Sequence, residues 1–110
     1  MDEIVSSGKN YNGFMISSTQ SDSKNIRIIT SLAADEMLKI DGVKASFVIS
    51  KLSINKYQIS ARSLGEENVQ LSMENLDGGG HNTMAAAQIK ATDTNEAREM
   101  LLSAIKKYIE

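Results

Sequence analysis

Apolar residues near the end of the chain recur every three or four positions between residues 97 and 108, with charged residues between them. This spacing predicts an amphipathic helix. Asp93-Thr94-Asn95-Glu96 comes just before it and has the form of a capping box, which pairs the free N–H groups at a helix start. A second helix is predicted over Ile26–Ile40, with Asp22 or Ser23 as its N-cap and Gly42 as its C-terminal cap. Its wide apolar face indicates packing against a sheet.

Alternation of apolar and polar residues predicts three strands, at Phe14–Ser18, Val43–Leu52 and Tyr57–Ser63. Asn55-Lys56 provides the turn of a hairpin that joins the second strand to the third. In the third strand, the alternation places Ser60 and Arg62 on one face, two residues apart and pointing the same way.

The other segments are less regular. Residues 1–10 are polar and mixed, which indicates a tail or a linker, and Tyr11-Asn12-Gly13 follows as a turn signal. Val69–Leu76 is predicted to be a short helix that begins after Asn68, a residue type that caps helices. Met84–Ala91 is rich in small side chains, and periodicity alone fits either a strand or a helix start there.

The 110-residue chain has the composition of one globular domain with a modest core. Its 12 Lys and Arg against 14 Asp and Glu give a net charge of −2, which argues against an overall field that gathers nucleic acid. The absence of cysteine excludes disulfides and thiolate metal sites. No apolar run approaches the length of a membrane span, and no signal-peptide pattern opens the chain.

Gly78-Gly79-Gly80-His81 stands out chemically, because three glycines precede the only histidine in the sequence. Glycines carry no Cβ, so a ligand can approach their backbone N–H groups closely, and an imidazole beside them suits a phosphate or a nucleobase. A structural interpretation fits the same pattern: Gly78 ends a helix in a left-handed cap, and the other two glycines form a turn.

Arg62 is the second candidate, because a guanidinium offers planar, paired donors to a phosphate and keeps its charge. Ser60 beside it can donate a hydroxyl hydrogen bond, Ser63 lies at the end of the same strand, and Asn82 follows the histidine. The competing interpretation is a solvated sheet face on which Arg62 makes a weak surface ion pair.

Two blocks of the sequence resemble one known domain. The segment Gly78–Gln88 is similar to the glycine–histidine motif of the DHH-associated domain, the second domain of the DHH phosphoesterase superfamily, and Ile59–Glu66 is similar to its Ser-x-Arg-Ser strand. Ala85-Ala86-Ala87-Gln88 and Ala61–Glu66 look like the branch of the GdpP-type membrane-bound cyclic-di-AMP phosphodiesterases. The resemblance covers about Tyr11 to Tyr108.

The resemblance implies a strand at Met84–Ala91, and the fold is then α/β, with a mixed sheet flanked by helices in the order β-α-β-β-α-β-α. It makes residues 11–110 a DHH-associated substrate-binding domain. The residues that it assigns to a cyclic dinucleotide or short oligonucleotide are Ser60, Arg62, Ser63, Gly78, Gly79, Gly80, His81 and Asn82. Ala85-Ala86-Ala87 would let the glycine segment sit close to the sheet.

A phosphodiester hydrolase normally needs a metal pair with several convergent ligands, and this chain has one histidine and scattered carboxylates. The resemblance implies an upstream DHH domain that binds two manganese ions, in a parent anchored in the bacterial membrane, with this domain in the cytoplasm. The isolated chain is expected to be inactive, and a homodimer is among its expected partners. Alternatives are the same domain of a nanoRNase or single-strand exonuclease, a nucleic-acid-binding module as in alanyl-tRNA synthetases, or a purely structural module.

Overall fold

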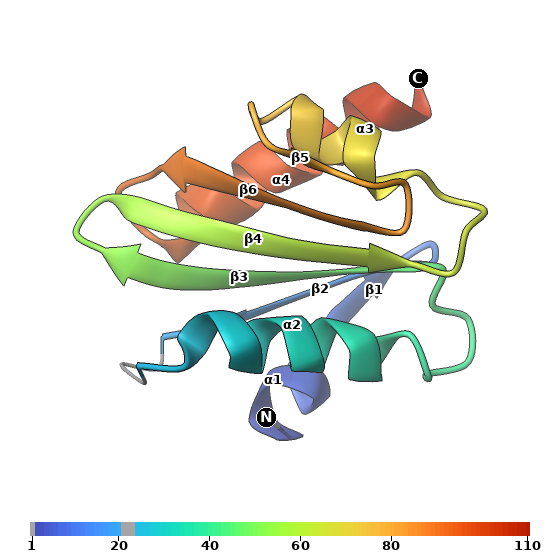
Figure 1. The fold of residues 1–110 in the computed structure, drawn as a ribbon, viewed down its shortest axis with the longest axis horizontal. Helices are drawn as coiled ribbons and strands as arrows, with labels where there is room; N and C mark the ends of the chain where they lie inside the picture. The colour runs from blue at the N-terminus through green and yellow to red at the C-terminus, as the bar shows by residue number, and fades with distance from the viewer. Residues whose placement is uncertain (1, 21–23) are drawn as a thin grey trace.

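The computed structural model describes residues 2–20 and 24–110, which form a mixed sheet in the order β1-β2-β3-β4-β6-β5 (Figure 1). The strands are β1 (Lys9–Tyr11), β2 (Phe14–Thr19), β3 (Ala45–Ser53), β4 (Lys56–Ser63), β5 (Gly79–Gly80) and β6 (Met84–Lys90). The helices are α1 (Asp2–Ser6), α2 (Ile26–Met37), α3 (Val69–Glu74) and α4 (Thr94–Ile109). β2 and β3 are parallel, and the other neighbouring strands are antiparallel.

This architecture confirms the predicted α/β class and the predicted succession of elements, which here is β2-α2-β3-β4-α3-β6-α4. The strand interpretation of residues 84–90 is also confirmed, and β6 alternates strictly between exposed and buried positions. The sequence pattern did not predict α1, β1 and β5. Each of them is five residues long or shorter, which is too short for a periodic pattern to be recognised.

Residues 2–10 differ from the tail or linker that their polarity indicates. Ile4 of α1 is only 6% exposed, and its carbonyl accepts a hydrogen bond from the Ser17 hydroxyl of β2. β1 pairs with β2 across the turn Asn12-Gly13, where both residues have positive φ, as in a tight hairpin. This segment is therefore an ordered part of the fold.

The sheet has two covered faces, each with its own core. α3 and α4 pack on one face, and α1 and α2 lie on the other (Figure 1). In β3, Phe47 and Ile49 point into the α4 side, whereas Val48 points into the α2 side. Successive residues of this strand therefore alternate between the two cores.

α2 ends at Met37, three residues before the predicted end, and Gly42 is not its cap. Leu38 is the C-cap, with right-handed helical dihedrals. Gly42 has φ +87° in a later turn, which the Val43 N–H closes on the Ile40 carbonyl and which requires a residue with positive φ. At the other end, the proposed N-caps Asp22 and Ser23 lie outside the described residues.

Candidate functional site

One half of the sheet is left open on the α2 side. α2 packs on β3 and β4, and it does not extend over β5 and β6 (Figure 1). The β6 side chains on this side are all exposed, and they lie opposite β4 residues in four register pairs: Arg62–Met84, Ser60–Ala86, Gln58–Gln88 and Lys56–Lys90. We call the four β6 positions, with the β4 positions that border them and the neighbouring edge strand β5, the open face; of the β4 positions, Ser60 is itself covered by α2.

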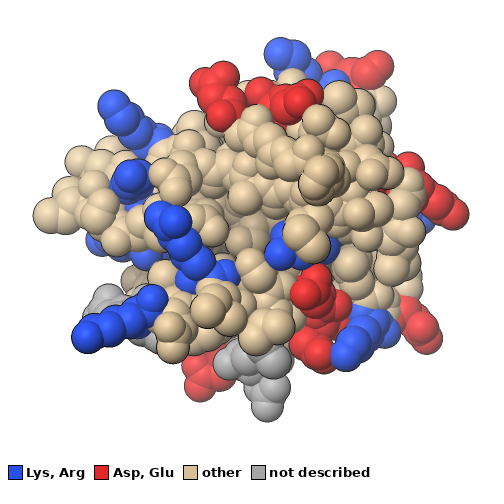
Figure 2. Space-filling model, in the orientation of Figure 1, with Lys and Arg blue, Asp and Glu red and all other residues tan. Residues whose placement is uncertain are grey.

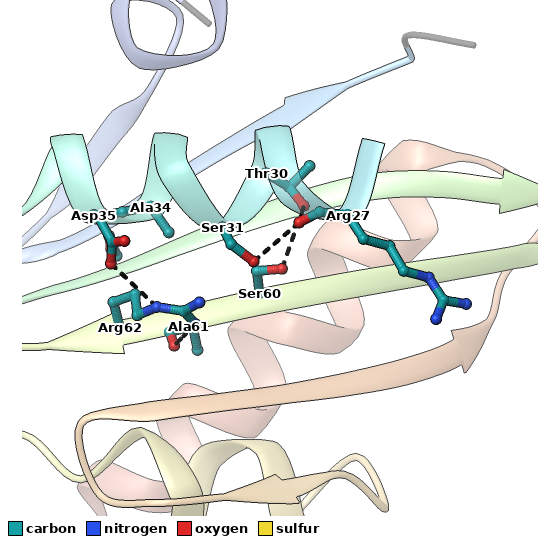
Figure 3. Close-up of polar contacts among 9 residues, drawn as sticks. Arg27, Thr30, Ser31, Ala34, Asp35, Ser60, Ala61 and Arg62 are labelled. Carbon is teal, nitrogen blue, oxygen red and sulfur yellow. Dashed lines mark hydrogen bonds and ion pairs between the residues drawn. The ribbon is translucent and has the colours of Figure 1, made fainter. Parts of the chain in front are cut away.

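Arg62 lies at one end of the open face, at the rim of α2 (Figure 3). Its Nε donates to Asp35 Oδ1 of α2 at 3.1 Å, and its Nη1 donates to the Ala61 carbonyl at 2.9 Å. The side chain is 12% exposed, whereas that of Asp35 is 53% exposed. The guanidinium is therefore held in one orientation by a partner that water partly screens.

The two serines near Arg62 occupy different environments. Ser60 is buried under α2, where its hydroxyl lies 3.4 Å from the Thr30 hydroxyl. Ser63 points to the opposite side of the sheet, and its hydroxyl donates to the Asn82 carbonyl at 3.2 Å. Neither hydroxyl is presented on the surface beside Arg62.

Gly79 and Gly80 form β5, and the glycine segment fits tightly against the small residues of β6. A Cβ added to Gly78 would lie 2.2 Å from the Ala86 carbonyl oxygen, and one added to Gly80, where φ is +144°, would lie 2.4 Å from that of Met84. At Gly79 nothing lies within 4 Å of the added atom. Gly78 and Gly80 therefore have no room for a side chain at this contact, whereas the role expected of the alanines stays a prediction.

The backbone of β5 presents hydrogen-bonding groups at the edge of the sheet. His81 and Met84 exchange both of their backbone hydrogen bonds, at 2.7 and 3.3 Å. Bonded and non-bonded pairs alternate in an antiparallel ladder, so the next pair, Gly80 and Ala85, is non-bonded. The N–H of Gly80 consequently points away from β6.

The turn that carries His81 and Asn82 lies next to the end of β4. Ser63 N–H donates to the Thr83 carbonyl, and Val69 N–H donates to that of Asn82. Because Met84 lies opposite Arg62, the histidine turn and the arginine strand meet at the same end of the open face. Both His81 and Asn82 are exposed there.

A shallow depression of about 460 Å³ lies farther along the open face. Of the residues assigned to the site from the sequence, it includes Gly78 alone. The other residues around it are Arg27, Gln58, Asp77, Ala86, Ala87 and Gln88. Figure 2 views this side of the molecule and shows Lys and Arg side chains at its centre and over the β3–β4 hairpin at its left end.

Sequence reasoning missed the polar side chains of this depression. Gln58 was recoverable, because it precedes Ser60 by two residues and shares its face. Arg27 was not, because its place depends on how α2 crosses the sheet. Figure 3 shows its side chain leaving the start of α2 and extending away from Ser60 and Arg62.

Within residues 2–20 and 24–110, no group of three or more His, Cys, Asp or Glu side chains is placed to hold a metal ion. No helix in those same ranges combines the length and the apolar character needed to cross a membrane.

Comparison with known proteins gives one family. The model of the DHHA1 domain matches residues 12–110. The chain is 45% identical over 98 residues to the cyclic-di-AMP phosphodiesterase PdeA of Listeria monocytogenes, covering 89% of this chain and 15% of that protein. It is 49% identical over 84 residues to the cyclic-di-AMP phosphodiesterase GdpP of Geobacillus thermodenitrificans, covering 76% and 13%.

A solved structure with the same fold is that of an exopolyphosphatase-related protein from Bacteroides fragilis, with a TM-score of 0.78 and 21% sequence identity. The match covers 97% of this chain and 33% of that one. The fold is therefore found as one part of a larger protein.

Proposed function

This chain belongs to the DHHA1 domain family, and we propose that it is the substrate-binding domain of a phosphodiesterase that hydrolyses cyclic di-AMP to linear diadenylate. The two relatives named as cyclic-di-AMP phosphodiesterases are 45% and 49% identical to it, and the chain spans 15% and 13% of their lengths. The observation that carries the proposal is the open face, where the Arg62 strand end and the Gly80-His81 turn lie at one end and a depression lies farther along.

Arg62 is proposed to bind a phosphate of the dinucleotide. Asp35 and the Ala61 carbonyl already orient its guanidinium, so little side-chain entropy is lost when a ligand binds. A charge-assisted hydrogen bond of this kind contributes about 1.5–3 kcal/mol. The outward N–H of Gly80 and the exposed His81 imidazole offer further donors at the same end, with Asn82 beside them.

These groups would act by positioning. Holding the non-reacting part of the dinucleotide orients the scissile phosphate and lowers the entropic part of the barrier. Ser60 and Ser63 contribute indirectly in this proposal, because Ser60 lies under α2 and Ser63 ties the Asn82 turn to β4.

The metal chemistry is proposed to belong to the rest of the parent protein. A pair of manganese ions in an upstream DHH domain would activate the water and stabilise the charge that develops on the phosphate. The single histidine and scattered carboxylates of this sequence support that division, and the isolated chain would then lack hydrolase activity. A membrane anchor elsewhere in the parent, a cytoplasmic place for this domain and a dimeric assembly belong to the same proposal.

The substitution Arg62→Ala in the full parent protein tests the proposal. Loss of one phosphate contact is expected to raise the KM for cyclic di-AMP about tenfold or more, since each 1.4 kcal/mol is a factor of ten. Arg98→Ala is the matched control, because Arg98 lies on α4 and bonds the Ser18 hydroxyl. Unchanged kinetics with a large drop in melting temperature would make Arg62 a structural residue.

The same assay distinguishes the alternatives by substrate. The parent should hydrolyse cyclic di-AMP faster than linear diadenylate or longer single strands. A preference for longer strands, with a steep dependence of binding on salt, would favour an exonuclease or a nucleic-acid-binding module, because many phosphate contacts release many counterions.

A further inference from the structure

The depression on the open face contains an amide pair that the phosphate contacts above do not use. Gln58 of β4 and Gln88 of β6 lie directly opposite each other in the sheet register, and both line the depression. Gln58 is only 9% exposed. Neither amide makes a hydrogen bond or ion pair with any residue among 2–20 and 24–110.

An unpartnered carboxamide in a nearly buried position is unfavourable unless something satisfies it. Gln58 has one carbonyl acceptor and two N–H donors, and Gln88 has the same set beside it. Water satisfies such groups in the free protein. A ligand with a matching edge of donors and acceptors would replace that water at little enthalpic cost.

The surroundings of the amide pair suit a flat, aromatic ligand. Ala86 contributes only a methyl group to the lining, and Gly78 has no side chain. Arg27 lines the same depression from α2, and no described residue pairs with its guanidinium. A planar guanidinium stacks on nucleobases, and glutamine amides hydrogen-bond to their edges.

We propose that Gln58, Gln88 and Arg27 form a subsite for an adenine base. Adenine presents an amino donor and a ring-nitrogen acceptor side by side, which match the carbonyl and N–H of one carboxamide. On its N7 edge guanine presents two acceptors, N7 and O6, so an amide that binds this edge is left with an unpaired carbonyl. The inference rests on the proposed function, because it names the groups that would recognise the base of the dinucleotide.

The position of the subsite agrees with a ligand that also reaches Arg62. Gln58 precedes Arg62 by four residues on the same strand, which is about 13 Å along an extended chain. A base at the amide pair and a phosphate at Arg62 would thus belong to one molecule that lies along the open face.

The test is an NMR titration of the ¹⁵N-labelled chain with adenosine and, separately, with guanosine. Adenosine is expected to shift the side-chain amide signals of Gln58 and Gln88 and to bind about tenfold more tightly than guanosine.

Gln88→Met should weaken adenosine binding about tenfold, because it keeps the length of the side chain and removes the amide. Gln70→Met is the matched control, since Gln70 lies on α3 and bonds Glu74. Equal binding of the two nucleosides, or wild-type affinity in Gln88→Met, would overturn the subsite, as would the absence of any adenosine shift.

A titration with cyclic di-AMP separates this inference from the function on which it rests. Shifts at Arg62 and His81 with none at the two glutamines would overturn the adenine subsite and leave the proposed function standing. Adenosine-selective shifts at the glutamines, with no hydrolysis of cyclic di-AMP by the parent, would support the subsite and overturn the proposed function.

Discussion

Gly78 and Gly79 are neighbours in the sequence, but a side chain would meet different surroundings at each. At Gly78, a Cβ would lie 2.2 Å from the Ala86 carbonyl oxygen and 2.6 Å from the Ala87 Cβ. At Gly79, the same atom would enter open space. One glycine is therefore required by packing, and the next leaves the backbone accessible.

Gly78→Ala is expected to destabilise the chain by about 1–3 kcal/mol, because the residue before β5 must move away from β6 to admit the methyl group. Gly79→Ala is expected to change stability by no more than about 0.5 kcal/mol, since it contacts nothing. Urea unfolding of the two variants measures both values. Equal stability of the two variants would show that β5 does not pack on β6 as closely as described.

At this scale, the sequence identified residue types better than their surroundings. Ala85–Ala87 were interpreted as room for the glycine segment, and that segment does lie against them, since an added Cβ at Gly78 would be 2.6 Å from the Ala87 Cβ. Ser60 and Arg62 do share a face, as alternation requires, but α2 covers the first and Asp35 holds the second. Those partners lie 30 and 27 residues away in the chain, and no local sequence pattern extends that far.

At the scale of elements, the ends with side-chain caps were the predictable ones. The Asp93 carboxylate accepts from the Glu96 N–H at 2.8 Å, and the Glu96 carboxylate accepts from the Thr92 N–H at 3.0 Å. The Glu96 side chain therefore bonds the N–H of Thr92, the residue before the N-cap Asp93. The end of α2 has no such signal, because Ile40 continues the apolar spacing while the chain is already turning toward β3.

Asp93→Ala is expected to cost about 1 kcal/mol, because the first turn of α4 loses the acceptor for one of its free N–H groups. Asn95→Ala, two residues later and exposed, is the control and should stay within about 0.5 kcal/mol of the parent chain. The comparison is made by thermal or urea unfolding. A cost at Asn95 equal to that at Asp93 would place the stabilisation in general helix propensity and not in the cap.

The molecule as a whole consists of one sheet with unequal covers. The α4 side holds the larger core, and it was predicted because the α4 pattern is long and regular. The α2 side holds a smaller core and the open face. Ile4 of α1 belongs to this smaller core, but the polar residues around it gave no helix pattern in the sequence. The position of Arg27 could not be predicted either, because it depends on how α2 packs across the sheet.

Deletion of residues 1–8 tests whether α1 is part of this cover. Burial of an isoleucine such as Ile4 contributes about 1.5–3 kcal/mol, and Ser17 also loses the acceptor for its buried hydroxyl. The deletion should therefore lower the free energy of unfolding by about 2–3 kcal/mol. Native-state hydrogen exchange should quicken in α2 before it does in α4, because α1 packs on α2 and β2. Unchanged stability and exchange would show that residues 1–8 are a dispensable tail. The packing of α2 beside the open face would then not depend on α1.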